Sequence, residues 1–552
     1  MNAMATHEVT NQPPPLVDHD PWARNRPLRD ALAQLLPGHD TGALAALGAE
    51  CGSAAMLEHA RLANVRPPLL RSHDRFGHRI DQVEFHPSYH ALMAAALRHG
   101  LHGAPWAAGA GAHIERAAGF MLFTECEPSV LCPVSMTYAV TPALRANPAL
   151  AAAWLPRIVA RDYDPRFVPL AHKRAVTLGM GMTEKQGGSD VRSNSTRAER
   201  DGSDDWGERY RITGHKWFMS APMCDAHLVL AQAAGGLSCF LLPRLLPDGR
   251  VNALHIQRLK HKLGNHANAS SEVEFHDALA WRVGDEGRGV PQILAMGALT
   301  RLDCALGSAG LMRAALTLAL HHCAHRSAFG RRLIEQPLMR NVLADLALES
   351  EAATVLALRL AAAIDRSEQP AHPERAHEAA LRRVLTPIAK FWVCKRGSHF
   401  GQEAMECLGG NGYVEDDGEG LMARIYREMP LNSIWEGAAN IMALDLLRAL
   451  RSADAGPALA RELAAARGVH AAYDRLAAGL PARIDGVGDE VTARTLARDI
   501  ALLLQAALLA RSAPPAVAEA WCRARLAAAS DVYGTLPADL PLDALIERAQ
   551  GG

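Results

Sequence analysis

A glutamate between a tryptophan and a glycine is the strongest candidate for acid–base chemistry in this chain. Glu436 lies between Trp435 and Gly437 and follows the apolar Ile434 and Trp435. Removal from water raises the pKa of a glutamate carboxyl toward the range in which it can act as a general base. The alternative interpretation is an exposed glutamate at the start of a helix, where the helix dipole favours negative charge.

Two further segments hold residue types that can contact a phosphate or a flat ring. Residues 181–190 combine three glycines with a serine and an aspartate, and small residues with free backbone N–H groups let such a ligand approach closely. Arg326 precedes the turn at Gly330, and its guanidinium suits a pyrophosphate. The alternatives are a tight turn in the first segment and a helix cap with a surface arginine in the second.

The composition is that of a folded protein with several domains. The chain has 552 residues, whereas a single hydrophobic core stops growing at roughly 250–300 residues. Hydrophobic residues make up 49% and charged residues 21%, which excludes a disordered chain. The 58 Lys and Arg residues balance the 59 Asp and Glu residues, so the net charge neither supplies nor excludes a basic surface for nucleic acid.

Cysteine spacing and hydropathy predict a cytoplasmic protein without a membrane partner. The ten cysteines include no C-x-x-C pair, which argues against a zinc ribbon and fits reduced thiols. No uninterrupted apolar stretch reaches the ~18 residues of a membrane span, and the start of the chain lacks a secretory-signal pattern. His321 and His325 are one helical turn apart, but no carboxylate accompanies them, so we expect no metal site.

The hydrophobic pattern divides the chain into four parts. We expect an N-terminal helical domain with an extended arm over residues 1–180 and a compact antiparallel β domain over 181–290. A helical bundle is expected over 291–450, followed by an added Ala/Leu-rich helical domain over 451–552. These elements must place the three candidate segments, which lie at the entry to the β domain and within the bundle.

Strand signals are concentrated in the second part. Polar and apolar residues alternate over 271–276, with the period of a β-strand. The apolar runs 225–234 and 237–243 are joined by two glycines, which predicts a hairpin, and 209–220 is a further candidate strand. Elsewhere we expect helices that include 91–98, 149–155, 338–346 and 376–408, an interhelix loop at 366–375 and a linker at 452–457.

The order of the motifs resembles the acyl-CoA dehydrogenase family of flavoproteins. That order is Met-Thr-Glu-x-x-Gly-Gly-Ser-Asp at 182–190, then Arg-x-x-Phe-Gly at 326–330, Leu-Gly-Gly-Asn-Gly-Tyr at 408–413 and Tyr-Arg-(x)₈-Glu-Gly at 426–437. Residues 182–195, the Trp-Glu-Gly segment and the extra C-terminal domain resemble the AidB branch of alkylation-response flavoproteins. The resemblance implies a mainly α fold: a helical N-domain, a central antiparallel β barrel, a four-helix bundle and the extra C-terminal helical domain.

The resemblance also implies bound FAD between barrel, bundle and a neighbouring subunit, and therefore a homo-oligomer, with a homotetramer as the family's usual state. The matching residues on the flavin side are Met180, Met182, Thr183, Gly188, Ser189, Phe218, Ser220, Trp435 and Asn440. The residues matching positions that reach the adenosine, the pyrophosphate or the neighbouring subunit's FAD are Arg326, Phe329, Gln336, Glu406 and Gly410.

In the same comparison Glu436 matches the general base that takes the α-proton of an acyl-CoA while hydride leaves for the flavin. Arg301 matches an arginine that helps hold the CoA arm, but Ala298 stands where the family usually has an aspartate. Arg448 follows Glu436 by twelve residues and would weaken the base if it faced it, or would point to solvent. We therefore expect weak turnover of ordinary acyl-CoA. The sequence does not indicate which electron acceptor would reoxidise the flavin.

The branch resemblance implies an alternative function, in which the protein binds double-stranded DNA through residues 451–552 and protects it from alkylation damage. This segment holds 11 Arg and no Lys against 12 acidic residues, so it has no excess of positive charge. DNA contact would require the arginines to share one face. The candidates are Arg494 and Arg498, four residues apart, and Arg523 and Arg525 on a separate segment.

Overall fold

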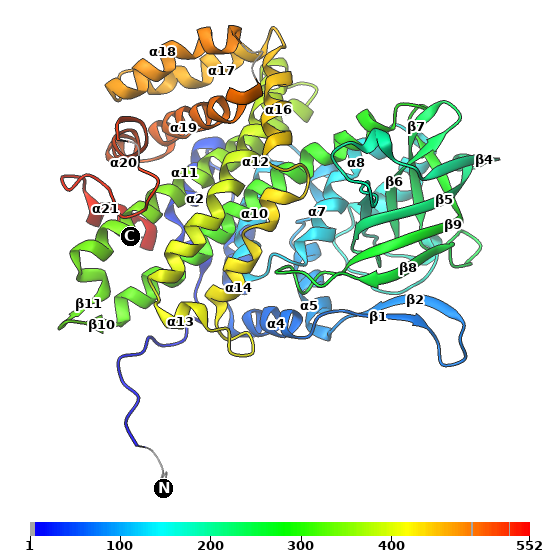
Figure 1. The fold of residues 1–552 in the computed structure, drawn as a ribbon, viewed down its shortest axis with the longest axis horizontal. Helices are drawn as coiled ribbons and strands as arrows, with labels where there is room; N and C mark the ends of the chain where they lie inside the picture. The colour runs from blue at the N-terminus through cyan, green and yellow to red at the C-terminus, as the bar shows by residue number, and fades with distance from the viewer. Residues whose placement is uncertain (1–5, 487–489, 529, 552) are drawn as a thin grey trace.

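The computed structural model describes residues 6–486, 490–528 and 530–551. Helices fill one half of the molecule and a sheet the other, with the C-terminal helices packed on the helical side (Figure 1). The helices before the sheet are α1 (Pro21–Arg24), α2 (Arg26–Leu35), α3 (Gly42–Cys51), α4 (Ala54–Val65), α5 (Pro87–Arg98), α6 (Ala112–Cys126), α7 (Leu131–Ala139), α8 (Thr141–Leu144) and α9 (Pro148–Ile158).

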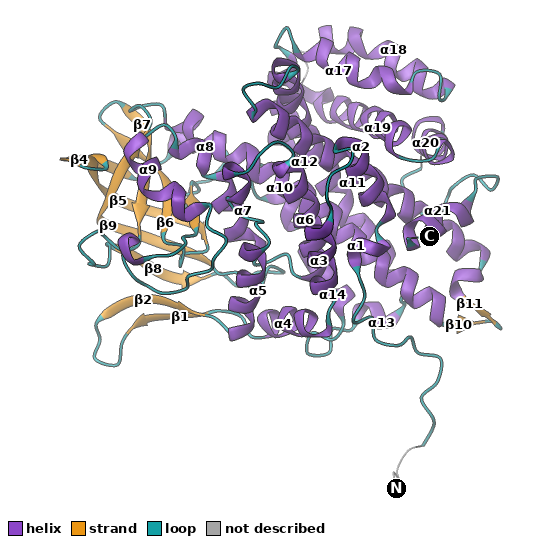
Figure 2. Ribbon diagram, turned by 180° about the vertical axis from the view of Figure 1, so that it is seen from behind, coloured by secondary structure: helices purple, strands orange, loops and turns teal. Residues whose placement is uncertain are grey.

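A hairpin that the sequence analysis did not predict interrupts these helices. Strands β1 (Leu69–His73) and β2 (Arg79–Glu84) extend from the helices along the sheet (Figure 2). Asp81, on β2, is buried, and its carboxylate accepts the backbone N–H of Ile256 at 3.0 Å. This contact joins residues 175 positions apart, so local hydrophobic periodicity gave no sign of it.

The central domain is a seven-stranded mixed sheet. Its strands are β3 (Leu178–Gly181), β4 (Arg197–Asp204), β5 (Gly207–Ser220), β6 (Ala226–Ala233), β7 (Gly236–Pro243), β8 (Leu254–Leu259) and β9 (Ser270–Val283). The predicted hairpin is confirmed as β6–β7, whose residues pair antiparallel from Ala226↔Pro243 to Ala233↔Gly236.

The expectation of a wholly antiparallel barrel is corrected by two pairings. Strand β3 runs parallel to β6, and β4 meets β6 in parallel through the single pair Arg197↔Gln232. Strand β7 pairs with both β6 and β9, so the sheet curls back on itself. The β4–β6 pairing consists of one residue pair, whereas β4 pairs with β5 along most of its length.

The bundle follows the sheet. Its long helices α10 (Gly289–His325), α11 (Pro337–Glu368) and α12 (Arg375–Glu406) pack against one another, and α16 (Ala439–Leu450) packs on α12. Helix α11 continues to Glu368, so the expected loop at 366–375 is shorter. The short elements between them are β10 (Ser327–Ala328), β11 (Arg331–Arg332), α13 (Gly410–Tyr413), α14 (Leu421–Glu428) and α15 (Leu431–Ile434).

Helix α10 is the core helix of this bundle. Among the described residues it is the one helix long and apolar enough to cross a membrane by length and composition alone. In the folded chain, however, 83% of its most apolar window is buried. Its apolar surface is therefore explained by packing against α6, α11 and α12.

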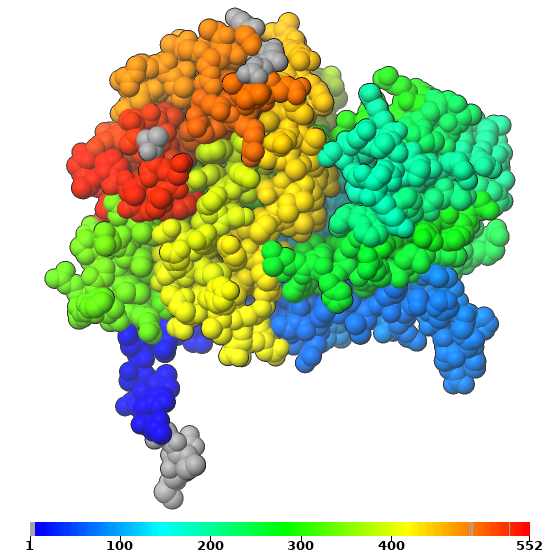
Figure 3. Space-filling view, viewed as in Figure 1, coloured from blue at the N-terminus to red at the C-terminus, as the bar shows by residue number. Residues whose placement is uncertain are grey.

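The C-terminal helices lie directly on the bundle (Figure 3). Helix α17 (Ala455–Leu463) starts within the segment expected to be the linker, and α18 (Ala471–Asp485), α19 (Ala493–Ser512), α20 (Pro515–Trp521) and α21 (Leu542–Gln550) follow. Helices α19 and α21 pack on α11. Arg548 of α21 binds Glu351 of α11 and Asp30 of α2, so ion pairs join the two ends of the chain to its middle.

A buried ion pair also joins the N-terminal helices to the bundle. Arg116 of α6 binds Asp303 of α10 through two bonds of 2.6 and 2.7 Å, and both side chains are almost fully buried. The Arg116 guanidinium also lies over the Tyr138 ring, 3.6 Å from its centroid. Breaking such a pair leaves one uncompensated charge in the interior.

We predict that Asp303→Asn lowers the stability of the folded chain by about 3–5 kcal/mol, because Arg116 would keep its charge without a counter-ion. The shift in urea midpoint, followed by circular dichroism, measures this loss. Asp248→Asn, which removes a partner from the exposed pair Arg250–Asp248, is the matched control and should leave the midpoint unchanged. Equal midpoints for the two variants would contradict the assignment.

Candidate active site

Glu436 lies on a strained turn between α15 and α16. Its φ is +59°, an uncommon value for a residue with a side chain, and Gly437 follows with φ +101°. Arg301 of α10 donates from Nε to the carbonyl of Glu436 at 2.9 Å. Lys390 of α12 donates from Nζ to the carbonyl of Gly437. Two cations from the bundle therefore fix the backbone of this turn.

The Glu436 carboxyl has one short hydrogen bond. The Thr300 hydroxyl donates to Oε2 at 2.7 Å and also lies 3.1 Å from the carbonyl of Gly297. Burial raises the pKa of Glu436 above its ordinary value, while Thr300, Arg301 and Lys390 act in the opposite direction. The arrangement can hold a carboxylate that is a stronger base than one in water.

Of the two alternatives for Arg448, the structure supports the one in which it points to solvent, so its candidacy as a catalytic residue is corrected. The Arg448 side chain is exposed on α16, and the charges acting on Glu436 come from Arg301 and Lys390. The twelve-residue spacing was misleading because α16 begins only at Ala439. Glu436 lies before the helix with a positive φ, so helical periodicity does not relate it to Arg448.

Arg301, the candidate for holding the CoA arm, has partners within the chain. Besides the Glu436 carbonyl, its guanidinium binds Asp445 of α16 at 3.2 Å, and Arg383 of α12 binds the other oxygen of Asp445. Through these bonds Arg301 positions the Glu436 turn. Lys390 was missed, although it is one of only seven lysines and lies in an apolar helical stretch.

The flavin-side residues come together where the loop after β3 meets β5. Met180 is on β3, and the backbone carbonyl of Thr183 accepts the N–H of Trp217 on β5 at 2.8 Å. A Cβ on Gly188 would lie 2.3 Å from Oγ1 of Thr183, so a larger residue there would force the Thr183 side chain to move. We call these flavin-side residues the first group. Its members on the loop and on β5 are Met182, Thr183, Gly188, Ser189, Phe218 and Ser220.

A buried ion pair that the sequence analysis did not single out anchors this loop. Glu184 binds Nζ of Lys216 at 2.8 Å, with both side chains fully buried, and accepts the backbone N–H groups of Ser195 and Thr196. Burial raises the pKa of Glu184, but Lys216 and these hydrogen bonds together hold it below its ordinary value. The loop is therefore fixed from behind by a charged carboxylate.

The remaining cofactor candidates lie at the other end of the molecule. Phe329, 99% exposed and with φ +54°, is on the β10–β11 turn after α10. Arg326 donates to the backbone of Asn11 in the N-terminal arm. Near it on α10, the Cys323 thiol donates to the carbonyl of Cys407, the residue after Glu406. This second group comprises Arg326, Phe329, Gln336, Glu406 and Gly410.

The two groups lie at opposite ends of the protomer (Figure 1). Thr300 and His325 are separated by twenty-five residues of α10, which is roughly 37 Å of helix. Figure 1 shows β10–β11 and the sheet at opposite ends of the molecule.

Trp435 and Asn440 both lie beside Glu436. Trp435 is half-buried and donates to Asn432, and Asn440 is exposed in the first turn of α16.

The four arginines proposed to contact DNA do not form one surface. Arg494 and Arg498 are exposed on α19, and Arg498 binds the adjacent Asp499. Arg523 pairs with Asp539. Arg525 is corrected: its guanidinium is mostly buried against α11, where it binds Asp345 and Glu349. Its place is in the contact between the C-terminal helices and the bundle.

Three family models match this chain. The N-terminal domain of adaptive response protein AidB matches residues 11–165, the middle domain of acyl-CoA dehydrogenase matches 179–278, and the C-terminal domain of acyl-CoA dehydrogenase matches 287–451. The chain is 46% identical to AidB of Escherichia coli (strain K12) over 553 aligned positions that cover 99% of both chains.

A Caenorhabditis elegans relative extends the comparison to a solved structure. The chain is 31% identical to acyl-CoA dehydrogenase family member 11 of that organism, over 78% of this chain and 70% of the relative. The solved structure of the worm protein in complex with C11-CoA superposes with a TM-score of 0.82 at 26% identity and covers 95% of this chain and 94% of that one. The chain therefore belongs to the acyl-CoA dehydrogenase family, in which it combines the family's middle and C-terminal domains with an AidB-type N-terminal domain.

Proposed function

We propose that this protein is an FAD-dependent acyl-CoA dehydrogenase-like oxidoreductase of the AidB type, with Glu436 as its general base. The observation that carries the proposal is the Glu436 carboxyl, whose burial raises its pKa on a turn held by Arg301 and Lys390. General bases work best when their pKa lies near the working pH, and desolvation is the means by which proteins achieve this for glutamate.

The residues of both groups fit a long, partly planar cofactor such as FAD. Phe218 is 52% exposed at the first group, with the Lys260 ammonium 4.4 Å from its ring centroid, and Phe329 is 99% exposed at the second. The glycine loop beside Thr183 allows close backbone approach, and Arg326 supplies a cation. The two groups lie at opposite ends of a protomer, which supports sites shared between copies, and the family resemblance favours a homotetramer.

The chain's own residues can manage the proton. Glu436 would take the α-proton of a bound acyl-CoA at its carboxylate, while bound flavin would supply a hydride acceptor for the β-carbon. Once protonated at Oε2, Glu436 can donate to Thr300, whose own proton then turns to the Gly297 carbonyl 3.1 Å away. Thr300 therefore has a partner for its hydroxyl proton in both states of the base.

Turnover of ordinary acyl-CoA is proposed to be weak. Arg301 already binds the Glu436 carbonyl and Asp445, which leaves it less free to hold a CoA arm. Ala298, one turn earlier on α10, offers no carboxylate. A substrate would therefore be held by fewer charged groups than the family pattern supplies.

We predict that Glu436→Gln slows flavin reduction by acyl-CoA at least about 100-fold, because no carboxylate would take the α-proton. The measurement is an anaerobic titration with short, branched and long acyl-CoA, followed by the flavin absorbance. Glu419→Gln, at an exposed glutamate, is the control, and dithionite should reduce both variants. Bleaching of the Glu436→Gln flavin at the normal rate would refute the assignment of the base.

Thr300→Val is expected to move the pH profile of flavin reduction to higher pH. The hydroxyl stabilises the carboxylate, so its loss raises the pKa of Glu436 further, and the active, deprotonated form is reached later as pH rises. Thr300→Ser keeps the donor and should restore the profile. A lower plateau rate with an unmoved midpoint would indicate a purely structural role.

Binding of double-stranded DNA is the alternative function, and its support is the AidB-type N-terminal domain. The exposed Arg494 and Arg498 are the candidates that still have accessible guanidinium groups. If the alternative holds, log affinity for a duplex will fall linearly with log salt, and replacing either arginine by Gln will reduce the slope by about one. Arg75→Gln, on the distant hairpin turn, is the control. Absence of duplex binding at low salt would exclude this function.

A further inference from the structure

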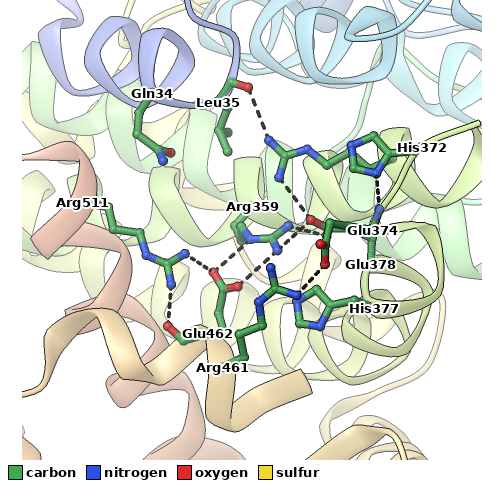
Figure 4. Close-up of a pocket in the computed structure, with 11 residues that line it drawn as sticks. Gln34, Leu35, Arg359, His372, Glu374, His377, Glu378, Arg461, Glu462 and Arg511 are labelled. Atoms are coloured by element: carbon green, nitrogen blue, oxygen red, sulfur yellow. Dashed lines mark hydrogen bonds and ion pairs between the residues drawn. The ribbon is translucent and has the colours of Figure 1, made fainter. Parts of the chain in front are cut away.

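A cavity of about 290 Å³ lies where three parts of the chain meet, away from Glu436. It is lined by the end of α2, by α11 and the start of α12, and by α17 and α19 of the C-terminal part (Figure 4). Glu378 in its wall and Lys390 beside Glu436 are twelve residues apart on α12, roughly 18 Å of helix. The cavity is thus separate from the proposed active site.

The lining is rich in hydrogen-bond donors. It contains four arginines against three glutamates, with two histidines in addition. Arg359 uses most of its N–H groups on Glu378 and Glu462, which it binds at 2.8 and 2.9 Å. Arg366 also binds Glu378, at 3.1 Å, and Arg511 also binds Glu462, at 2.7 Å. Four guanidinium groups thus face three carboxylates, which leaves one positive charge in excess.

Two of these arginines keep most of their donors. Arg511 binds one carboxylate oxygen and the backbone carbonyl of Glu462, and Arg461 binds Glu374. A guanidinium has five N–H groups, so within the described part of the chain most of those on Arg461 and Arg511 lack a protein acceptor. His372 accepts the backbone N–H of Glu374 at Nδ1, which places its own proton on Nε2 as another donor.

A cavity whose guanidinium groups have unused N–H donors suits a ligand that only accepts hydrogen bonds. A tetrahedral oxyanion meets this requirement, since its oxygens can accept from several guanidinium groups at once. The volume is near the lower end of the roughly 300–1,000 Å³ of small-molecule pockets, larger than one phosphate needs. We propose that this cavity binds a small phosphorylated molecule and so ties the C-terminal helices to the bundle.

The alternative is that these charges serve only to dock α17 and α19 on the bundle. That explanation requires no ligand, because Arg359 already joins Glu378 of α12 to Glu462 of α17. The two explanations predict different effects on phosphate binding when a charge at the cavity rim is changed. Arg461 and Glu374 form the exposed pair at that rim, so their variants should fold normally.

Calorimetric titration with pyrophosphate, inorganic phosphate and AMP, against sodium chloride of equal ionic strength, tests the proposal on the full-length protein. Arg461→Gln should weaken binding about tenfold or more, the effect of losing a charged hydrogen-bond donor. Glu374→Gln should tighten binding, because it removes a competing carboxylate. Arg475→Gln, at an exposed arginine outside the cavity on α18, should bind as the wild type does.

The probes also separate the possible sources of the phosphate. Binding of AMP in preference to inorganic phosphate, with the same dependence on Arg461, would identify an organic phosphate, and the reverse would identify a free oxyanion. Absence of binding by all three probes, or equal binding by wild type and Arg461→Gln, would overturn the site. None of these measurements depends on flavin or on Glu436.

Discussion

Buried carboxylates on the long bundle helices are the constraint on which the rest of the architecture depends. Asp303 of α10 and Glu349 and Glu351 of α11 are removed from water, and an isolated buried charge is strongly unfavourable. Each is matched by an arginine from another part of the chain: Arg116 from α6, Arg525 after α20 and Arg548 from α21. The domains are therefore joined through charges that would be costly to leave alone.

The cations in these buried pairs are all arginine. Seven of the 58 Lys and Arg residues are lysine. A guanidinium can bind a carboxylate through two parallel bonds, as Arg116 does with Asp303, and it holds its proton when buried. Two of the few lysines, Lys216 and Lys390, are themselves buried, and each fixes a loop proposed to work on cofactor or substrate.

The proposed active site follows the same constraint on a smaller scale. The Glu436 turn has a strained backbone, and its two carbonyls are held by cations from α10 and α12. The same cations oppose the rise in the pKa of Glu436 that burial causes. The bundle thus sets both the position and the basicity of one carboxyl, while Thr300 gives its oxygen a defined partner.

Local features were readable from the sequence because they depend on neighbours along the chain. The alternation at 271–276 and the glycine pair after Ala234 predicted β9 and the β6–β7 hairpin, and the Trp-Glu-Gly tripeptide singled out Glu436. The motif order further indicated the family. These signals need only side-chain period, turn chemistry and local composition.

Contacts between distant residues were decided by tertiary packing. Arg301 reaches Glu436 across 135 positions, and Arg525 reaches Glu349 across 176, so nothing in either neighbourhood indicated the partner. Arg448 points to solvent because it lies on the face of α16 opposite to the one that packs on the bundle. The chain sequence by itself determined which residues could do chemistry, whereas folding determined which of them face one another, because only packing can bring remote charges together and remove them from water.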